Sequence, residues 1–115
     1  MAHVSLDGLQ VAIEHHLDLE EAKRRVERAA EDLSQGSLAK QQPTVTRPAP
    51  ERLLLTGGRG TTKFEAEIVV AADRVTVDLR GGFELSFVEL TFAGGASGVR
   101  KRVHAEVERV LGERL

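Results

Sequence analysis

The sequence predicts an α+β domain in which two helices pack on one face of an antiparallel sheet. Two patterns predict it: apolar residues recur every three or four positions near both ends of the chain, and they alternate with polar residues between. The predicted order of elements is β-α-β-β-β(-β)-α, since one sheet face can bury both helical stripes. With 115 residues, 41% hydrophobic and 30% charged, residues 1–115 are expected to form a single domain.

The N-terminal third predicts a strand followed by a long helix. Residues 9–13 alternate in hydrophobicity, whereas from Asp18 the apolar residues follow one helical face. Asp18 is expected to cap the first amides, with Glu21 completing a capping box, and Gly36 to end the helix in the left-handed conformation. The apolar stripe consists of Leu19, Ala22, Val26, Ala29 and Leu33.

The middle of the chain predicts a loop and then a block of strands. Residues 36–50 are expected to be a mobile loop, because three prolines remove backbone donors and disfavour helix. Clean alternation beyond this loop predicts a sheet with one packed and one solvated face. The predicted strands are residues 52–56, 62–71 and 74–80, joined by turns at 57–60 and 72–73.

The C-terminal third is expected to end in a second helix. Residues 83–92 fit a strand or a helical face, and we expect a strand that bends near Val88. Residues 93–98 predict a loop of small residues, and the helix is expected to begin at Val99. Substituting a charge for Val26 or Val103 is expected to unfold the domain, because both lie on buried stripes. The second stripe consists of Val99, Val103, Val107, Val110 and Leu111.

Three consecutive cations form the candidate binding site. Arg100, Lys101 and Arg102 would lie in the first turn of the second helix, where the helix dipole already places positive charge. A phosphate, an acidic partner or a neighbouring carboxylate would relieve this repulsion, so we consider the three cations a candidate anion or partner contact. The alternative is a basic turn that solvent and salt screen.

No pattern in the sequence indicates catalysis, a cofactor or a metal. The chain has no Cys, which excludes disulfides and thiolate chemistry. His15 and His16 are adjacent and would point to opposite faces of a strand, which predicts a structural role. The glycines near Lys63 fit a hairpin better than a phosphate loop, because Lys63 opens a strand. With no Gly-x-Ser-x-Gly elbow either, we expect a protein that is not an enzyme.

The expected location is the cytoplasm. No apolar run is long enough to cross a membrane, and the N-terminus has no basic segment followed by an apolar one. The net charge of −2 makes a nucleic-acid partner unfavourable unless the positive charges cluster.

The first helix resembles the opening helix of the polyhydroxyalkanoic acid granule-region proteins. Residues 16–28, HLDLEEAKRRVER, fit the pattern His-Leu-x-x-Glu-Glu-Ala-x-x-Arg-Val, and the predicted element order is similar over most of the chain. The family's Trp residues are absent here, and the link after the helix is Pro-rich. The motif positions, for which we expect structural roles at the strand–helix junction, are His16, Leu17, Ala22, Arg25 and Val26.

The resemblance implies a non-enzymatic accessory protein at or near polyester storage granules. It would bind a granule protein or a polyester-synthesis protein and associate with itself, since a symmetric dimer can cover exposed sheet edges. Two alternatives remain. The element order also resembles ribosome hibernation factors, so an RNA- or ribosome-binding module is the second hypothesis. The third is an enzyme or small-ligand binder with a cleft beneath residues 36–50.

Overall fold

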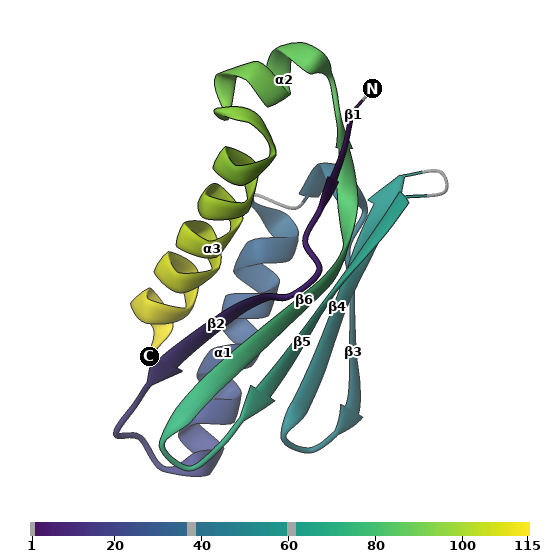
Figure 1. Cartoon of the computed structure of the whole chain (residues 1–115). Helices are drawn as coiled ribbons and strands as arrows, with labels where there is room; N and C mark the ends of the chain where they lie inside the picture. The colour runs from purple at the N-terminus through teal and green to yellow at the C-terminus, as the bar shows by residue number, and fades with distance from the viewer. Residues whose placement is uncertain (1, 37–38, 60–61) are drawn as a thin grey trace.

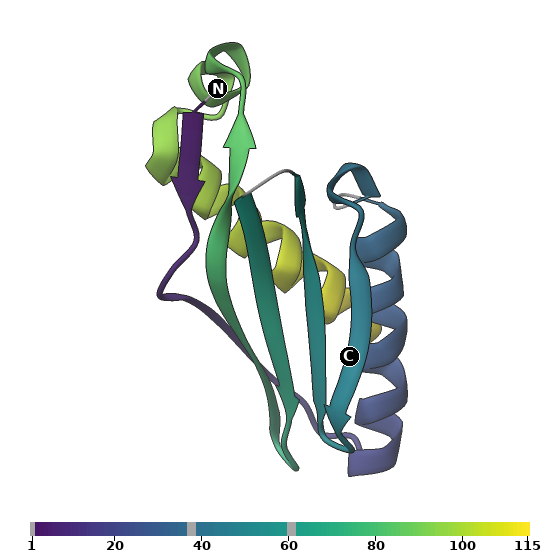
Figure 2. The ribbon, with the colours of Figure 1, turned by 90° about the vertical axis from the view of Figure 1, so that its right-hand side faces the viewer.

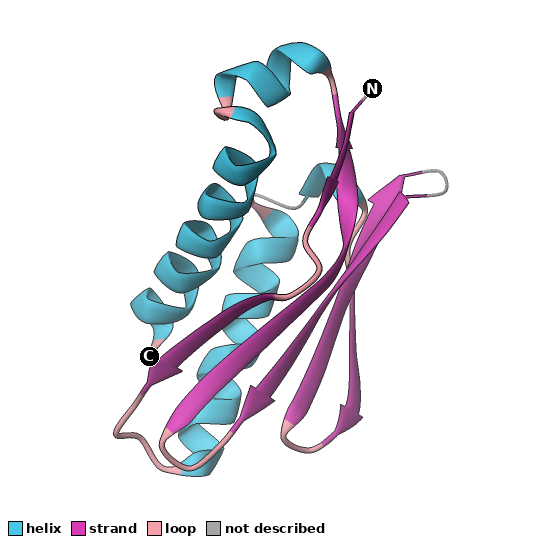
Figure 3. Ribbon diagram, viewed as in Figure 1, coloured by secondary structure: helices cyan, strands magenta, loops and turns pink. Residues whose placement is uncertain are grey.

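The structure, a computed structural model, describes residues 2–36, 39–59 and 62–115. It is an α+β fold in which two long helices cover one face of an antiparallel sheet, as the sequence predicts (Figures 1 and 3). The elements in chain order are β1 (Ala2–Ser5), β2 (Leu9–Glu14), α1 (Leu19–Gln35), the 3₁₀ turn η1 (Ala39–Gln41), β3 (Thr44–Ala49), β4 (Arg52–Arg59), β5 (Thr62–Val70), β6 (Arg74–Leu85), α2 (Phe87–Phe92) and α3 (Gly95–Arg114).

The sheet contains a meander of β3, β4, β5 and β6. Along the edge of β6 that faces away from β5, two further strands pair with it one after the other. The first half of β6 pairs with β2, from Glu14 opposite Arg74 to Leu9 opposite Leu79, and its end pairs with β1. The sequence did not indicate β1. Its residues are only four, and the strand that they pair with lies about eighty positions away in the chain.

The predicted alternation in the central strands is confirmed. Phe64, Ala66, Ile68 and Val70 of β5 are buried, and so is the inward series of β6, Val75, Val77 and Leu79. The opposite face carries charged pairs between neighbouring strands, of which Arg52 Nη2 to Glu67 Oε2 is 2.5 Å long. One sheet face is therefore apolar and covered by helices, and the other is polar.

The strand predicted to end at residue 80 continues to Leu85 as β6. Gly81 has φ +79°, and the link between β1 and β2 attaches there: Leu6 N donates to its carbonyl at 2.7 Å and its own N–H donates to Asp7 Oδ1 at 2.8 Å. A Cβ at Gly81 would lie 2.0 Å from the carbonyl oxygen of Lys63. Glycine thus lets the strand bend where its partner changes from β2 to β1.

Helix α1 begins as predicted, with Asp18 Oδ1 accepting a hydrogen bond from Glu21 N at 2.9 Å. Two details of the prediction are wrong. The Glu21 carboxylate does not complete the predicted box but accepts from Arg25 Nε at 2.8 Å. Gly36 ends the helix, yet its φ of −103° is not left-handed, and its N–H donates to the Asp32 carbonyl at 2.9 Å.

The segment expected to be a loop, residues 36–50, contains η1 and the strand β3 in its described part. Proline did not prevent the strand because β3 lies at the edge of the sheet, where one side of the backbone needs no donor. The pairing with β4 shifts register between Thr46 and Ala49, around Pro48. Mobility of this segment stays a prediction. Of the turn expected at 57–60, residues 57–59 belong to β4, and residue 60 lies outside the described residues.

Residues 83–92 divide into two elements. The segment is strand as far as Leu85, and then Ser86 caps α2, with Ser86 Oγ accepting from Glu89 N at 3.1 Å and Glu89 Oε1 accepting from Ser86 N at 3.2 Å. The expectation of a continuous strand missed this capping box. The predicted loop at 93–98 is also wrong, because α3 begins at Gly95. A Cβ at Gly98 would lie 1.7 Å from the Ala93 carbonyl oxygen, so glycine permits this tight corner.

Candidate binding site

The candidate anion contact does not lie where it was predicted. Because α3 begins at Gly95, Arg100, Lys101 and Arg102 are in its second turn and not at its N-terminus. Arg100 Nη1 donates to the carbonyls of Ser5 at 2.9 Å and Asp7 at 3.1 Å, so this side chain ties α3 to the link between β1 and β2. Lys101 and Arg102 are exposed, and a partner contact for these two stays a prediction.

The structural histidine is His15, whereas the family pattern had suggested His16. His15 is 5% exposed, and its Nε2 lies 2.9 Å from the Ala71 carbonyl oxygen while Leu17 N donates to its Nδ1 at 3.2 Å. The ring thus joins the end of β2 to the turn between β5 and β6. His16 is exposed. The parity of the strand could have predicted this, because His15 continues the inward series of Val11 and Ile13.

Of the other motif positions, Ala22, Arg25 and Val26 lie on α1, and Leu17 precedes it. Ala22 and Val26 are fully buried, and Leu17 is half-buried. Arg25 donates from Nη1 to the carbonyl oxygen of Arg114 at 3.3 Å, so it joins α1 to the end of α3. The motif therefore forms part of the contact between the two helices.

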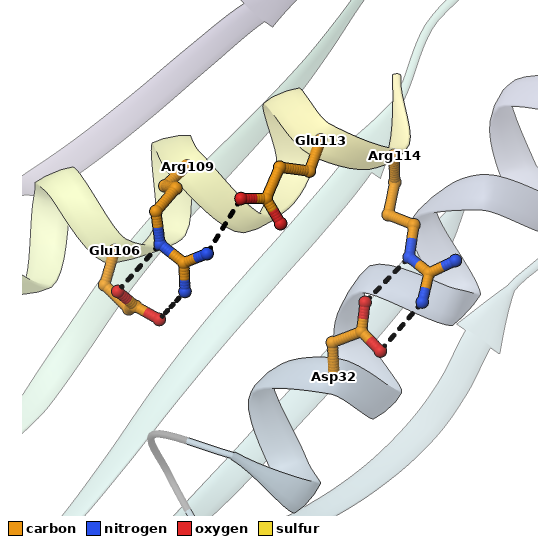
Figure 4. Close-up of polar contacts among 5 residues, drawn as sticks. All are labelled: Asp32, Glu106, Arg109, Glu113 and Arg114. Carbon is orange, nitrogen blue, oxygen red and sulfur yellow. Dashed lines mark hydrogen bonds and ion pairs between the residues drawn. The ribbon is translucent and has the colours of Figure 1, made fainter.

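A second polar tie joins the same two helix regions. Arg114 donates to both carboxylate oxygens of Asp32, at 2.7 and 2.9 Å (Figure 4). These hydrogen bonds lower the pKa of the Asp32 carboxyl group, and the charge of the guanidinium adds to the effect while burial opposes it. The same bonds raise the pKa of Arg114. The contact holds the C-terminal end of α3 against α1.

Arg109 faces solvent one turn before Arg114. Its guanidinium pairs with Glu106 at 2.6 Å and with Glu113 at 2.9 Å (Figure 4). The hydrogen bonds with Glu106 and then Glu113 raise the pKa of Arg109, although its ordinary value is already high. Three of the charges on this face of α3 are thus engaged with one another.

Helices α1 and α3 are joined by the contact between Asp32 and Arg114, and they diverge from there toward the start of α3. Figure 2 shows α3 crossing behind the strands at an angle, with its C-terminal end beside α1 and its first turns far from it. The part of the sheet between the diverging helices forms the floor of an open groove of about 660 Å³. Helix α2 closes the end of this groove nearest the start of α3.

The groove is lined almost entirely by apolar side chains. Its floor consists of buried residues of the sheet and of α3, and its accessible walls are Leu85 of β6 and Val103 of α3, with Val88 and Phe92 of α2. The floor residues include Leu55, Phe64, Ala66, Ile68, Val77, Leu79, Val107 and Leu111. Val103 packs against the core but is only half-buried, so a charge there should be tolerated better than one at Val26.

Beside the groove, α2 exposes three large apolar side chains. Phe87 is 69% exposed, Val88 65% and Phe92 79%, and we call these three residues the apolar ridge. Isolated exposed apolar residues are common on proteins, but a cluster next to an apolar groove marks an interaction site. Sequence reasoning missed it because all three residues were assigned to a strand.

The polar residues that line the groove in the described part of the chain are Gln41, Glu89, Arg102 and Glu106. Glu106 pairs with Arg109, and Glu89 takes part in the cap of α2. Arg102 makes one hydrogen bond within the described part of the chain, from Nη2 to the Phe92 carbonyl at 3.3 Å. This arrangement can bind an apolar group and place a single guanidinium beside it.

The described residues contain no group of three His, Asp or Glu side chains placed to hold a metal ion. None of the helices in the described ranges is long and apolar enough to cross a membrane. Comparison of the chain with protein-family models, with curated proteins and with solved structures finds no match in any of the three.

Proposed function

We propose that this chain is a non-enzymatic interaction protein that binds an apolar surface through the apolar ridge, Phe87, Val88 and Phe92. The observation that carries the proposal is the exposure of all three side chains on one short helix. The resemblance of residues 16–28 to the polyhydroxyalkanoic acid granule-region proteins supplies the partner, which is the polyester granule surface or a protein bound to it. Such a role places the chain in the cytoplasm at storage granules.

The ridge can supply enough free energy for binding. A buried Phe side chain removes about 150–250 Å² from water, and burial contributes roughly 25 cal/mol per Å². Even partial burial of Phe87 and Phe92 therefore offers several kcal/mol to an apolar surface. Ordering costs are small, because the capping box at Ser86 and the contact of α2 with α3 already hold the helix in place.

The alternative of an RNA-binding module draws less support from the charges. Arg24 and Arg25 both pair with Glu21, and Arg100 donates to backbone carbonyls. The cations that could contact phosphates are therefore largely engaged within the chain. Basic surfaces for nucleic acid are normally contiguous and open.

Self-association is a second proposal, which the exposed edge of the sheet supports. Strand β3 is an edge strand, although Pro48 and the shift of register around it leave mainly residues 44–46 for regular pairing with another chain. We expect a dimer, and static light scattering across micromolar concentrations tests it. A monomer at every concentration would contradict this proposal and leave the ridge unaffected.

Sedimentation with particles of poly(3-hydroxybutyrate) tests the function directly. We expect the wild-type chain to pellet with the particles and the variant Phe87→Ser/Phe92→Ser to bind at least about tenfold more weakly, a loss of 1.4 kcal/mol or more. Val45→Ser is the matched control, since Val45 is an exposed apolar residue on β3, away from the ridge. Equal binding by the ridge variant and the control would refute the proposal.

A further inference from the structure

We infer that the groove between α1, α3 and the sheet binds a single-chain carboxylate, with its acyl chain along the apolar walls and its carboxylate on Arg102. This inference goes beyond the proposed function, because it requires neither a polyester surface nor insertion of the ridge. It identifies a small-molecule site that shares Val88 and Phe92 with the apolar ridge but does not include Phe87.

The dimensions and lining of the groove fit an acyl chain. Its volume of about 660 Å³ falls within the range of small-molecule sites, which is about 300–1,000 Å³. Leu85, Val88, Phe92 and Val103 form walls that remain accessible above a buried apolar floor. A flexible methylene chain laid between these walls would remove apolar surface from water on both partners.

The charges at the groove select the head group. Among the side chains that the structure describes, Arg102 is the cation in the groove lining, and its hydrogen bond to the Phe92 carbonyl is long, at 3.3 Å. A guanidinium binds a carboxylate through two parallel hydrogen bonds. Glu89 and Glu106 also line the groove, and both carboxylates are engaged within the chain.

The floor of the groove also favours an unsubstituted chain. Buried residues such as Leu55, Phe64 and Leu111 offer no hydrogen-bond partner, so a polar group placed over them would lose its water without replacement. A ligand with hydroxyl groups along its length should therefore bind less well than a saturated one. The predicted class is a saturated fatty carboxylate.

Isothermal titration with dodecanoate, below its micellar concentration, tests the inference. We expect saturable binding of one dodecanoate per chain. Arg102→Gln should weaken that binding about tenfold or more, whereas Lys101→Gln should not, because Lys101 is an exposed cation on the same helix that does not line the groove. Val103→Phe should abolish binding by filling the space, and its circular dichroism and melting temperature show whether the fold persists.

Other results would overturn the inference. They are the absence of saturable binding, equal effects of Arg102→Gln and Lys101→Gln, or unchanged binding by a folded Val103→Phe chain. A groove closed by a second copy would appear as a dimer that Val103→Phe dissociates and that takes up no dodecanoate. Phe87→Ser separates this site from the proposed function. Phe87 does not line the groove, so that variant should lose affinity for polyester and keep dodecanoate binding.

Discussion

Helix α3 has two halves that carry the same apolar repeat and meet different surroundings. Its C-terminal half places Val110 and Leu111 against the sheet and α1, where Arg114 fixes the helix to Asp32. Its N-terminal half places Val103 on the wall of an open groove. The difference comes from the angle at which α3 crosses, since α1 reaches only one half. An apolar stripe thus shows that a helix face is covered, but not what covers it.

The largest expected effect contrasts a buried charge on α1, the helix that covers the closed half of α3, with a charge on the groove wall. Val26→Asp places a carboxylate at a position that is 0% exposed, and an unpaired buried charge costs about 3–5 kcal/mol or more. We expect that variant to be largely unfolded at 25 °C. Val103→Asp should cost about 1 kcal/mol, because its side chain can reach water from the groove wall.

Circular dichroism in a urea titration measures both variants. Val103→Asp also serves as a control for helix propensity, since both substitutions place Asp inside a helix. If Val103→Asp unfolds the chain as completely as Val26→Asp, the groove wall is as closed as the core beneath α1 and the contrast fails.

Truncation of large apolar side chains sharpens the same contrast. Leu53 is buried on β4 outside the groove, so Leu53→Ala should lower the free energy of unfolding by about 2–5 kcal/mol. Phe92→Ala should change it by no more than about 0.5 kcal/mol, although it removes the larger side chain, because Phe92 is exposed. Chemical denaturation measures the free energy of unfolding of both variants. A decrease of several kcal/mol for Phe92→Ala would show that the ridge is part of the core.

The histidine pair gives an intermediate effect. His15→Ala leaves the Ala71 carbonyl and the Leu17 amide without their partners, which should cost about 1–3 kcal/mol. His16→Ala is the matched control and should leave the melting temperature unchanged, since His16 is exposed. Thermal melts of the two variants distinguish them. A larger decrease in melting temperature for His16→Ala would show that His16, the position in the family pattern, has the structural role at the junction.

The smallest expected effect concerns the polar tie between the helices. The pKa of Asp32 is lowered in the folded chain, so its ionised form stabilises the fold at pH values above the unfolded pKa, about 3.9. This contribution is lost as the pH falls through the lower, folded pKa. Asp32→Asn should therefore be slightly less stable than wild type at pH 7, with the difference shrinking toward pH 2. A difference that grows on acidification would contradict the assignment.

Sequence patterns predicted the elements whose residues face one side consistently. Helix α1, with its cap at Asp18, and the alternation of β5 and β6 follow from local periodicity alone. The failures arose where distant contacts decide the structure. Strand β1 depends on its partner at the end of β6, and β3 is possible only because it lies at an edge that tolerates Pro48.

The candidate site was less predictable than the fold. Cations are visible in a sequence, so Arg100, Lys101 and Arg102 attracted attention, but the start of α3 at Gly95 moved them away from the helix terminus. The groove depends on the crossing angle of two helices, which no local pattern encodes. One signal was available: Ser86 and Glu89 form a capping box that predicts α2, and with it the outward direction of the ridge.

The most direct test of the division of α3 into a closed and an open half is an NMR titration. Dodecanoate is added to the wild-type chain, and the amide chemical shifts are followed in two-dimensional spectra. Changes are expected for Leu85, for α2 and for the first half of α3, with little change for Ala22, Val26 and Ala30 of α1. Changes concentrated on the polar face of the sheet, or spread evenly over the chain, would contradict the assignment of the open half as a binding site.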